Sequence, residues 1–239
     1  MKRAAWILAA ASAEALARQD PIGRLEIADR PVSMMALLAA MALLPFAVVM
    51  LTSFSKIAVV LSLARSAMGT QQAPPTIVLT GLAVVLTGHI MAPVAEQMYA
   101  AAERDLVDGE PTSRLLSQAA EVAAPLRAFL VKHGSPDERA RFVELARELR
   151  GDGGAPVTEA DLAVVVPAFV ITELKEAFEI GFLVFLPFLV VDMVVANVLL
   201  ALGMQSLSPS QVSLPFKVLL FVAVDGWALL ARGLILGYR

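Results

Sequence analysis

Seven charged side chains lie inside or directly beside long apolar stretches of this sequence. They are Lys56, Arg65, Glu173, Lys175, Asp192, Lys217 and Asp225. A charge in apolar surroundings is costly unless it is paired, so each needs a partner of opposite sign in the same chain or in a neighbouring subunit. Lys56 and Lys217 need partners most, because apolar residues flank both. Asp192 and Asp225 are candidate partners by type, with either assignment open, and Arg65 has the alternative of extending to a membrane boundary.

Few residues have the types and spacings that catalysis or metal binding requires. There is no cysteine, and the two histidines, His89 and His133, are 44 residues apart. A metal site would need a carboxylate cluster, which the sequence lacks. No Gly-x-Ser-x-Gly motif provides a hydrolase site, and a net charge of −3 gives no basic surface for nucleic acid. We therefore expect no enzymatic activity, no cofactor or metal and no nucleic-acid partner.

The composition requires that much of the surface be covered by something other than water. Of 239 residues, 58% are hydrophobic and 17% charged, with a mean hydropathy of +0.74, whereas soluble domains average about 45–50% apolar and about 25% charged residues. Four apolar spans can be drawn, each interrupted by a charge or a proline, at 34–55, 76–95, 170–191 and about 212–236, with a fifth apolar segment at 193–207. Lipid tolerates neither unpaired charges nor open backbone groups. We therefore expect an all-α, membrane-associated fold of bent, interrupted helical hairpins that bury these groups against other subunits.

The first part of the chain divides into three segments. Residues 1–17 begin with two basic residues, continue through an Ala-rich stretch and end in Ala-Leu-Ala, which predicts a cleavable signal peptide, with an amphipathic tail as the alternative. Residues 18–33 are a polar segment. Residues 34–95 form the first hydrophobic hairpin, because the GTQQAPP sequence at Gly69–Pro75 ends one helix before the next begins.

The second part of the chain has a charged and an apolar segment. Residues 96–161 hold 21 of the 41 formal charges and predict a solvated helical insert, with an amphipathic helix at 137–150. Residues 162–239 form a second hydrophobic region. Its uncharged stretch from 193 to 216 has a polar tip, which predicts a helical hairpin that turns near 203–209.

Three long blocks of the sequence resemble one protein family. They are LTSFSKIAVVLSLARSAMGTQQAPP at 51–75, VVPAFVITELKEAFEIGFLVFLPFLVVDMVVANVLLALGM at 165–204 and SPSQVSLPFKVLLFVAVDGW at 208–227. Together they are similar to the FliP/SctR family, the export-gate proteins of bacterial type III secretion systems. The resemblance covers about residues 34–100 and 160–236. It is specific, because three separate blocks agree in the same order.

The resemblance implies an assembly at the bacterial inner membrane. Members of the family form a helical ring of several copies, with small S-type subunits and an R/T-type subunit, beside larger export-gate and switch subunits. Unfolded secreted proteins pass through this ring, and much of it projects to the periplasmic side. The charged insert at 96–161 corresponds to the family's periplasmic region. By this resemblance the chain is a pore subunit rather than an enzyme.

The resemblance also implies a pore gate. In the family a ring of methionines after the LALGM segment closes the conduit, and Met204 matches the first of these positions. Gln205, Ser206 and Leu207 stand where further methionines are common. We therefore expect a gate formed by Met204, Gln205 and Leu207, apolar at its first and last positions and wetter in between.

Several residues favour the injectisome branch of the family over the flagellar branch. Lys56 in SFSKI and Asn197 in ANVLLALG look like the injectisome type. Glu176 and Glu179 in KEAFEIGF also look like the injectisome type. Flagellar members more often have Arg in the motif that corresponds to SFSKI and Gln in the motif that corresponds to KEAFEIGF. The signal-like start favours the flagellar alternative. A further alternative is a secondary transporter that works alone and uses the charged residues as an ion path.

Overall fold

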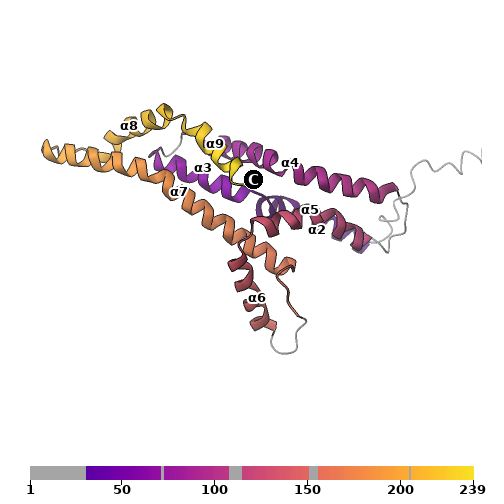
Figure 1. Ribbon diagram of the computed structural model, residues 1–239. Helices are drawn as coiled ribbons and strands as arrows, with labels where there is room; N and C mark the ends of the chain where they lie inside the picture. The colour runs from indigo at the N-terminus through magenta and orange to yellow at the C-terminus, as the bar shows by residue number, and fades with distance from the viewer. Residues whose placement is uncertain (1–30, 71–72, 108–114, 151–155, 205) are drawn as a thin grey trace, which may run out of the picture. The chain divides into compact units, whose positions relative to one another are not determined.

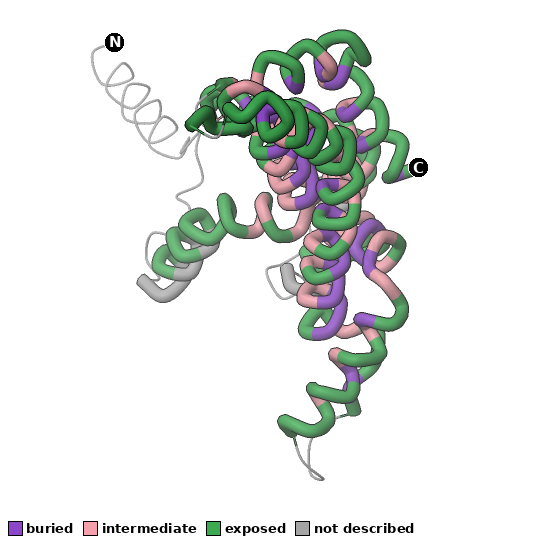
Figure 2. Tube along the Cα trace, turned by 90° about the vertical axis from the view of Figure 1, so that its left-hand side faces the viewer, coloured by how far each residue is buried: buried purple, intermediate pink, exposed green. Residues whose placement is uncertain are grey.

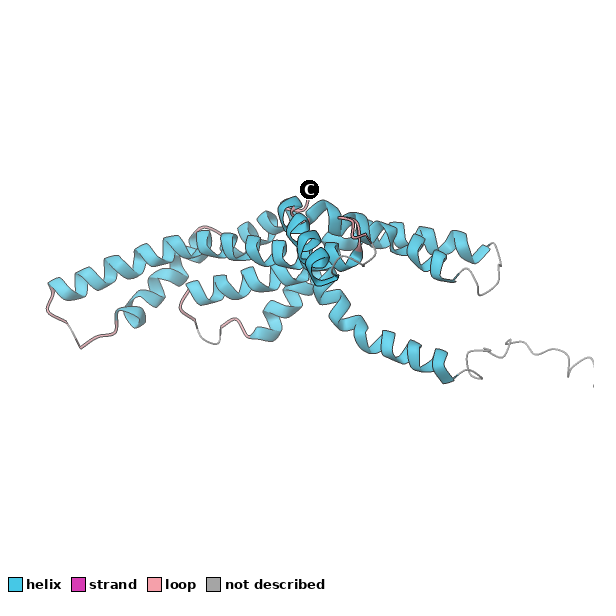
Figure 3. Cartoon of the chain, turned by 90° about the horizontal axis from the view of Figure 1, so that it is seen from below, coloured by secondary structure: helices cyan, strands magenta, loops and turns pink. Residues whose placement is uncertain are grey.

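The computed structural model describes residues 31–70, 73–107, 115–150, 156–204 and 206–239. The predicted signal peptide at 1–17 and the polar segment up to residue 30 lie outside these ranges. Within them the chain forms helices and connecting loops without a strand (Figure 3), which confirms the all-α prediction. The helices are α2 Pro31–Leu51, α3 Phe54–Ala67, α4 Thr76–Val107, α5 Leu115–His133, α6 Pro136–Arg150, α7 Leu162–Ala201, α8 Pro209–Ala223 and α9 Gly226–Leu236.

The chain divides into two units after Phe46. The described part of the first unit is the beginning of α2, which continues through Pro45 without ending there. Its large apolar side chains, including Met35, Met41 and Phe46, are well exposed in the single chain. An exposed apolar helix of this kind requires lipid or another protein around it.

Helix α7 is the central element of the second unit. It contacts α3, α5, α6 and α8 (Figure 1), and its 40 residues make it about 60 Å long at about 1.5 Å per residue. The sequence suggested a break between a span ending at 191 and an apolar segment at 193–207, but one helix continues across this point as far as Ala201. No Gly or Pro lies between Phe188 and Ala201 to end it. The helix ends at Ala201, and Gly203 follows with a φ of 68°, which favours glycine, at the start of the predicted turn near 203–209.

The first hairpin forms around the predicted turn. Helix α3 ends at Ala67, Gly69 follows with a φ of 75°, and α4 begins at Thr76. Helix α3 then packs against both α4 and α7, so that Ile57, Val60 and Ala64 have no exposed surface. This contact is the centre of the main apolar core, which α8 and α9 complete.

The charged stretch at 96–161 contributes helices to the same unit. Helix α4 continues past residue 95 to Val107, and α5 packs against α4 and α7. The predicted helix at 137–150 is confirmed as α6, which packs on α7. The α5–α6 loop is tied to α7, because the Ser135 backbone N–H donates to Thr172 Oγ1 at 2.9 Å.

Two described helices are long and apolar enough to cross a membrane, and two bent pairs could add one span each. The single helices are Thr76–Glu103 and Leu162–Ala201. The pairs are Met41–Leu51 with Phe54–Ala67, bent by 63°, and Pro209–Ala223 with Gly226–Leu236, bent by 58°. These bends agree with the expectation of bent, interrupted hydrophobic helices.

Gly181 allows α7 to approach α3 closely, and this contact can be tested. A Cβ built on Gly181 would lie 2.2 Å from Leu63 Cδ1, whereas one on Gly88 of α4 would meet nothing within 4 Å. We expect Gly181→Ala to lower the free energy of unfolding by about 1–3 kcal/mol through overpacking. Gly88→Ala, the matched control, should raise it by about 0.5–1 kcal/mol. Thermal unfolding of the detergent-solubilised chain measures both, and equal effects would contradict the close contact.

Candidate functional site

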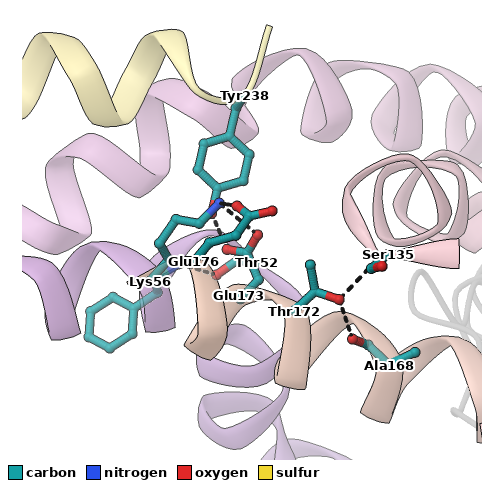
Figure 4. A network of polar contacts seen from close by, with 9 residues as sticks. Thr52, Lys56, Ser135, Ala168, Thr172, Glu173, Glu176 and Tyr238 are labelled. Atoms are coloured by element: carbon teal, nitrogen blue, oxygen red, sulfur yellow. Dashed lines mark hydrogen bonds and ion pairs between the residues drawn. The ribbon is translucent and has the colours of Figure 1, made fainter. Parts of the chain in front are cut away.

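The most buried charged cluster joins α3 to α7. Lys56 is 4% exposed, and its Nζ lies 3.0 Å from Glu173 Oε1 and 2.5 Å from Glu176 Oε2 (Figure 4). Residues three apart lie on one face of a helix, so α7 presents both carboxylates to the same ammonium. Sequence reasoning offered aspartates as partners of this lysine, but the structure places two glutamates there.

Tyr238, two residues after α9, completes the cluster. Its hydroxyl donates a hydrogen bond to Glu173 Oε2, and Lys56 Nζ lies 4.2 Å from the centre of its ring. A cation over an aromatic face is electrostatically favourable. Nothing in the sequence singled out Tyr238, because its role depends on where α9 ends in space. We call Lys56, Glu173, Glu176 and Tyr238 the Lys56 cluster.

The charges of the Lys56 cluster do not sum to zero. Two carboxylates share one ammonium, which leaves a formal charge of −1. Glu173 is completely buried, whereas the Glu176 side chain is 47% exposed. Glu176 therefore carries the surplus charge to the surface, and the buried Glu173–Lys56 pair stays neutral. A buried pair that loses one member leaves an uncompensated charge, which is far more costly than the pair itself is stabilising.

A second ion pair fixes α8 on α7. Lys217 Nζ lies 2.6 Å from Asp192 Oδ2, and Ser213 Oγ donates to Asp192 Oδ1 at 2.6 Å. Ser213 and Lys217 are four residues apart on α8, so both reach the same carboxylate. Lys217 is 5% exposed. Asp192 was a candidate partner by type, and the structure assigns it to Lys217.

The other charged residues singled out by sequence lie nearer the surface. Arg65 Nη1 donates to Thr76 Oγ1 at 2.9 Å and so bridges the turn between α3 and α4. Lys175 is exposed and lies 3.6 Å from the buried carboxylate of Glu138 on α6, a residue that sequence reasoning missed. Asp225 is exposed between α8 and α9, with a φ of 51°.

The expected gate residues lie in the turn between α7 and α8. Met204 and Leu207 are each 47% exposed, and Gln205 is outside the described residues. Figure 2 views this end of the hairpin, which is coloured as exposed. The Met204 and Leu207 side chains are therefore available for contact with lipid or with another protein chain. No group of three or more potential metal ligands occurs among the residues that the structure describes.

The fold and the site define a class of protein. It is a helical membrane protein whose buried lysines are paired within the chain and whose apolar surface is left for lipid or for other proteins. A match to the FliP family model over residues 37–234 places the chain in that family. The chain belongs to the FliP family.

Relatives from both secretion and flagellar systems are similar to the chain. Pathogenicity-related ORF2 of Xanthomonas campestris pv. glycines is 46% identical over 198 residues, which are 82% of this chain and 92% of the relative. The hypersensitivity response secretion protein HrcR of Ralstonia nicotianae is 42% identical over 210 residues, 87% of this chain and 97% of the relative. The flagellar biosynthetic protein FliP of Caulobacter vibrioides is 44% identical over 214 residues, 89% of this chain and 78% of the relative.

Removal of the Lys56 ammonium should destabilise the protein strongly. Lys56→Ala leaves Glu173 buried without its cation, and we expect the free energy of unfolding to fall by about 3–5 kcal/mol. Lys175→Ala, which removes an exposed lysine, should change it by less than about 0.5 kcal/mol. Thermal unfolding in detergent compares the two variants. Similar melting temperatures for both would show that the Lys56 cluster does not hold α3 on α7.

His133 at the end of α5 should make stability depend on pH. Its burial, followed by the positive charges of Lys132 and Lys56, lowers its pKa below the ordinary 6.5, against the opposing effect of Glu176. The unfolded chain therefore binds a proton more readily, so the His133 contribution to stability is lost as the pH falls below about 6.5. A pH series of melting temperatures measures this loss. This loss of stability at low pH should be smaller in the His133→Gln variant. It should remain in the His89→Gln variant, which changes the exposed histidine.

Proposed function

We propose that this chain is a core subunit of a type III secretion export gate and forms the inner-membrane pore through which unfolded substrate proteins pass. Its membership of the FliP family supports the export role, because relatives that are 42% and 44% identical are named as a secretion protein and a flagellar biosynthetic protein. The exposed hairpin of α7 and α8 is the feature that supports the pore. The chain then acts by shaping a conduit and not by catalysis.

The length and exposure of α7 are the observation that carries the proposal. The length of α7, about 60 Å, is twice the thickness of the hydrocarbon core of a bilayer, which is roughly 30 Å. Large apolar side chains are nevertheless exposed along most of it: Phe178, Phe182, Leu183, Leu186, Leu189, Met193, Val194, Val198 and Leu200. The exposed stretch from Phe178 to Leu200 is about 33 Å long, close to one bilayer thickness, so both lipid and other subunits are suited to cover it. We assign part of this surface to other protein subunits, because relatives in the FliP family are named as secretion and flagellar biosynthetic proteins.

Two apolar hollows beside α7 suit helical partners. One, of about 470 Å³, lies between α7 and α8 and is lined by residues such as Val194, Val198 and Phe216. The other, of about 240 Å³, lies over Gly181 and is lined by residues such as Leu63 and Phe182. We assign these surfaces to further copies of the chain and to the small S-type and R/T-type subunits. The ring would stand beside the larger export-gate and switch subunits and project to the periplasmic side.

The hairpin between α7 and α8 is the proposed gate. Met204 and Leu207 lie at its turn, exposed beside serines, and a methionine side chain adapts readily to changing contacts. In a ring, several copies of this turn would meet and form an apolar constriction that opens for a passing polypeptide. Gln205 would add a polar side chain at the same level.

We assign the chain to the injectisome branch, with the flagellar branch as the alternative. The similar identities to HrcR and FliP relatives leave the choice to individual residues. Lys56 and Glu176, both typical of the injectisome type, form an ion pair at 2.5 Å, so the two identities depend on each other.

A stand-alone ion transporter fits the geometry less well. Asp192 lies 16 residues after Glu176 on α7, about 24 Å along the helix. Between them the helix carries one charged residue, the exposed Glu179. The Lys56 cluster and the Asp192–Lys217 pair are thus separate local contacts, whereas an ion path needs groups spaced closely enough to pass a charge.

The gate can be tested in the assembled complex. We expect Met204→Ala combined with Leu207→Ala to raise the ion conductance of planar bilayers that contain the chain co-purified with its S-type and R/T-type partners, because the constriction loses apolar volume. Leu219→Ala, which alters an exposed leucine on α8 away from the turn, is the control. Wild-type conductance from a fully assembled double variant would contradict the gate. Conductance by the chain without partners would instead favour the transporter.

A further inference from the structure

Tyr238 makes contacts to three helices at once. It is 8% exposed, and besides its contacts to Lys56 and Glu173 its ring packs against two rings of α5. The centre of the Tyr238 ring lies 5.9 Å from the centre of the Phe129 ring, and the two rings are nearly parallel, with an angle of 14° between their planes. It lies 5.0 Å from the centre of the His133 ring. Tyr238, two residues after α9, thus touches α3, α5 and α7.

The hydroxyl of Tyr238 has a specific task in the Lys56 cluster. Glu173 is completely buried, and Lys56 faces its Oε1. Its other oxygen, Oε2, receives the hydrogen bond from Tyr238. A hydrogen bond to a charged acceptor is worth more than a neutral one, and a buried oxygen without a donor carries a desolvation cost. The hydroxyl therefore holds the Glu173 carboxylate in the orientation that presents Oε1 to Lys56.

The ring of Tyr238 has a different task. It covers the imidazole of His133 on one side, while Phe129 lies 4.7 Å from the same imidazole. The charged groups that act on His133 are Lys132 on α5, Lys56 on α3 and Glu176 on α7. Burial and the two lysines favour the neutral imidazole. The ring therefore covers one side of a half-buried histidine.

We propose that Tyr238 is a positioning residue that orients Glu173 on Lys56 through its hydroxyl and covers one side of His133 with its ring. Docking of the segment after α9 then fixes the geometry of the Lys56 cluster. The inference concerns contacts within one chain and does not depend on the proposed pore.

The hydroxyl can be tested with a matched pair of tyrosines. The chain has two, and Tyr99 on α4 is 72% exposed. We expect Tyr238→Phe to raise the unfolding equilibrium constant about tenfold and Tyr99→Phe to leave it unchanged. In a Glu173→Gln background the Tyr238→Phe effect should fall to about threefold, since the acceptor is no longer charged. An equal effect in both backgrounds would mean that the hydroxyl acts by packing alone, and would overturn this half of the proposal.

The ring can be tested through the two histidines. Isotope labelling of histidine gives two imidazole signals by NMR, one from His133 and one from the exposed His89, and a His89→Gln sample assigns them. We expect Tyr238→Ala to move the His133 titration midpoint upward, towards 6.5, and Tyr238→Phe, which keeps the ring, to leave it nearly in place. Tyr238→Leu serves if the alanine variant does not fold. An unchanged midpoint in the variants without the ring would overturn the shielding role.

Discussion

A buried lysine ammonium must have an anion beside it, and in this chain that requirement decides which helices pack together. Lys56 brings α3 to the part of α7 that carries Glu173 and Glu176, and Lys217 brings α8 to Asp192 further along the same helix. The two contacts are about 24 Å apart along α7. The helix is therefore held at two points, and the apolar contacts around α3 fill the space between them.

Internal pairing of these charges has a consequence for the outer surface. Because the buried lysines find their partners within the chain, the exposed faces of α7 after Glu179 and of α8 after Gln211 can remain almost entirely apolar. Such faces are suited to lipid and to the apolar helices of other subunits. The hairpin turn with Met204 and Leu207 is exposed at the end of this surface, as a gate contributed by several copies would require.

Local features of this structure could be predicted from sequence, and long-range ones could not. Gly69 and the prolines after it marked the first hairpin, and the spacing of apolar residues marked α6, because both depend on neighbouring residues. The flanking apolar sequence also showed that Lys56 and Lys217 need partners. The choice of Glu173 for Lys56 depended on which stretch of α7 meets α3, and that contact includes a close approach at Gly181 that only the three-dimensional structure reveals. The position of Tyr238 likewise depends on the path of α9.

The most direct test of the account asks whether the Asp192–Lys217 pair forms within one chain. Asp192→Lys and Lys217→Asp should each prevent assembly when present alone, because each places two like charges together. The account predicts that assembly with the S-type and R/T-type partners recovers when both changes are in the same chain. It also predicts no recovery when two chains, each with one change, are co-expressed. Recovery in the mixed sample but not in the doubly changed chain would show that the pair joins neighbouring subunits, and would contradict the account.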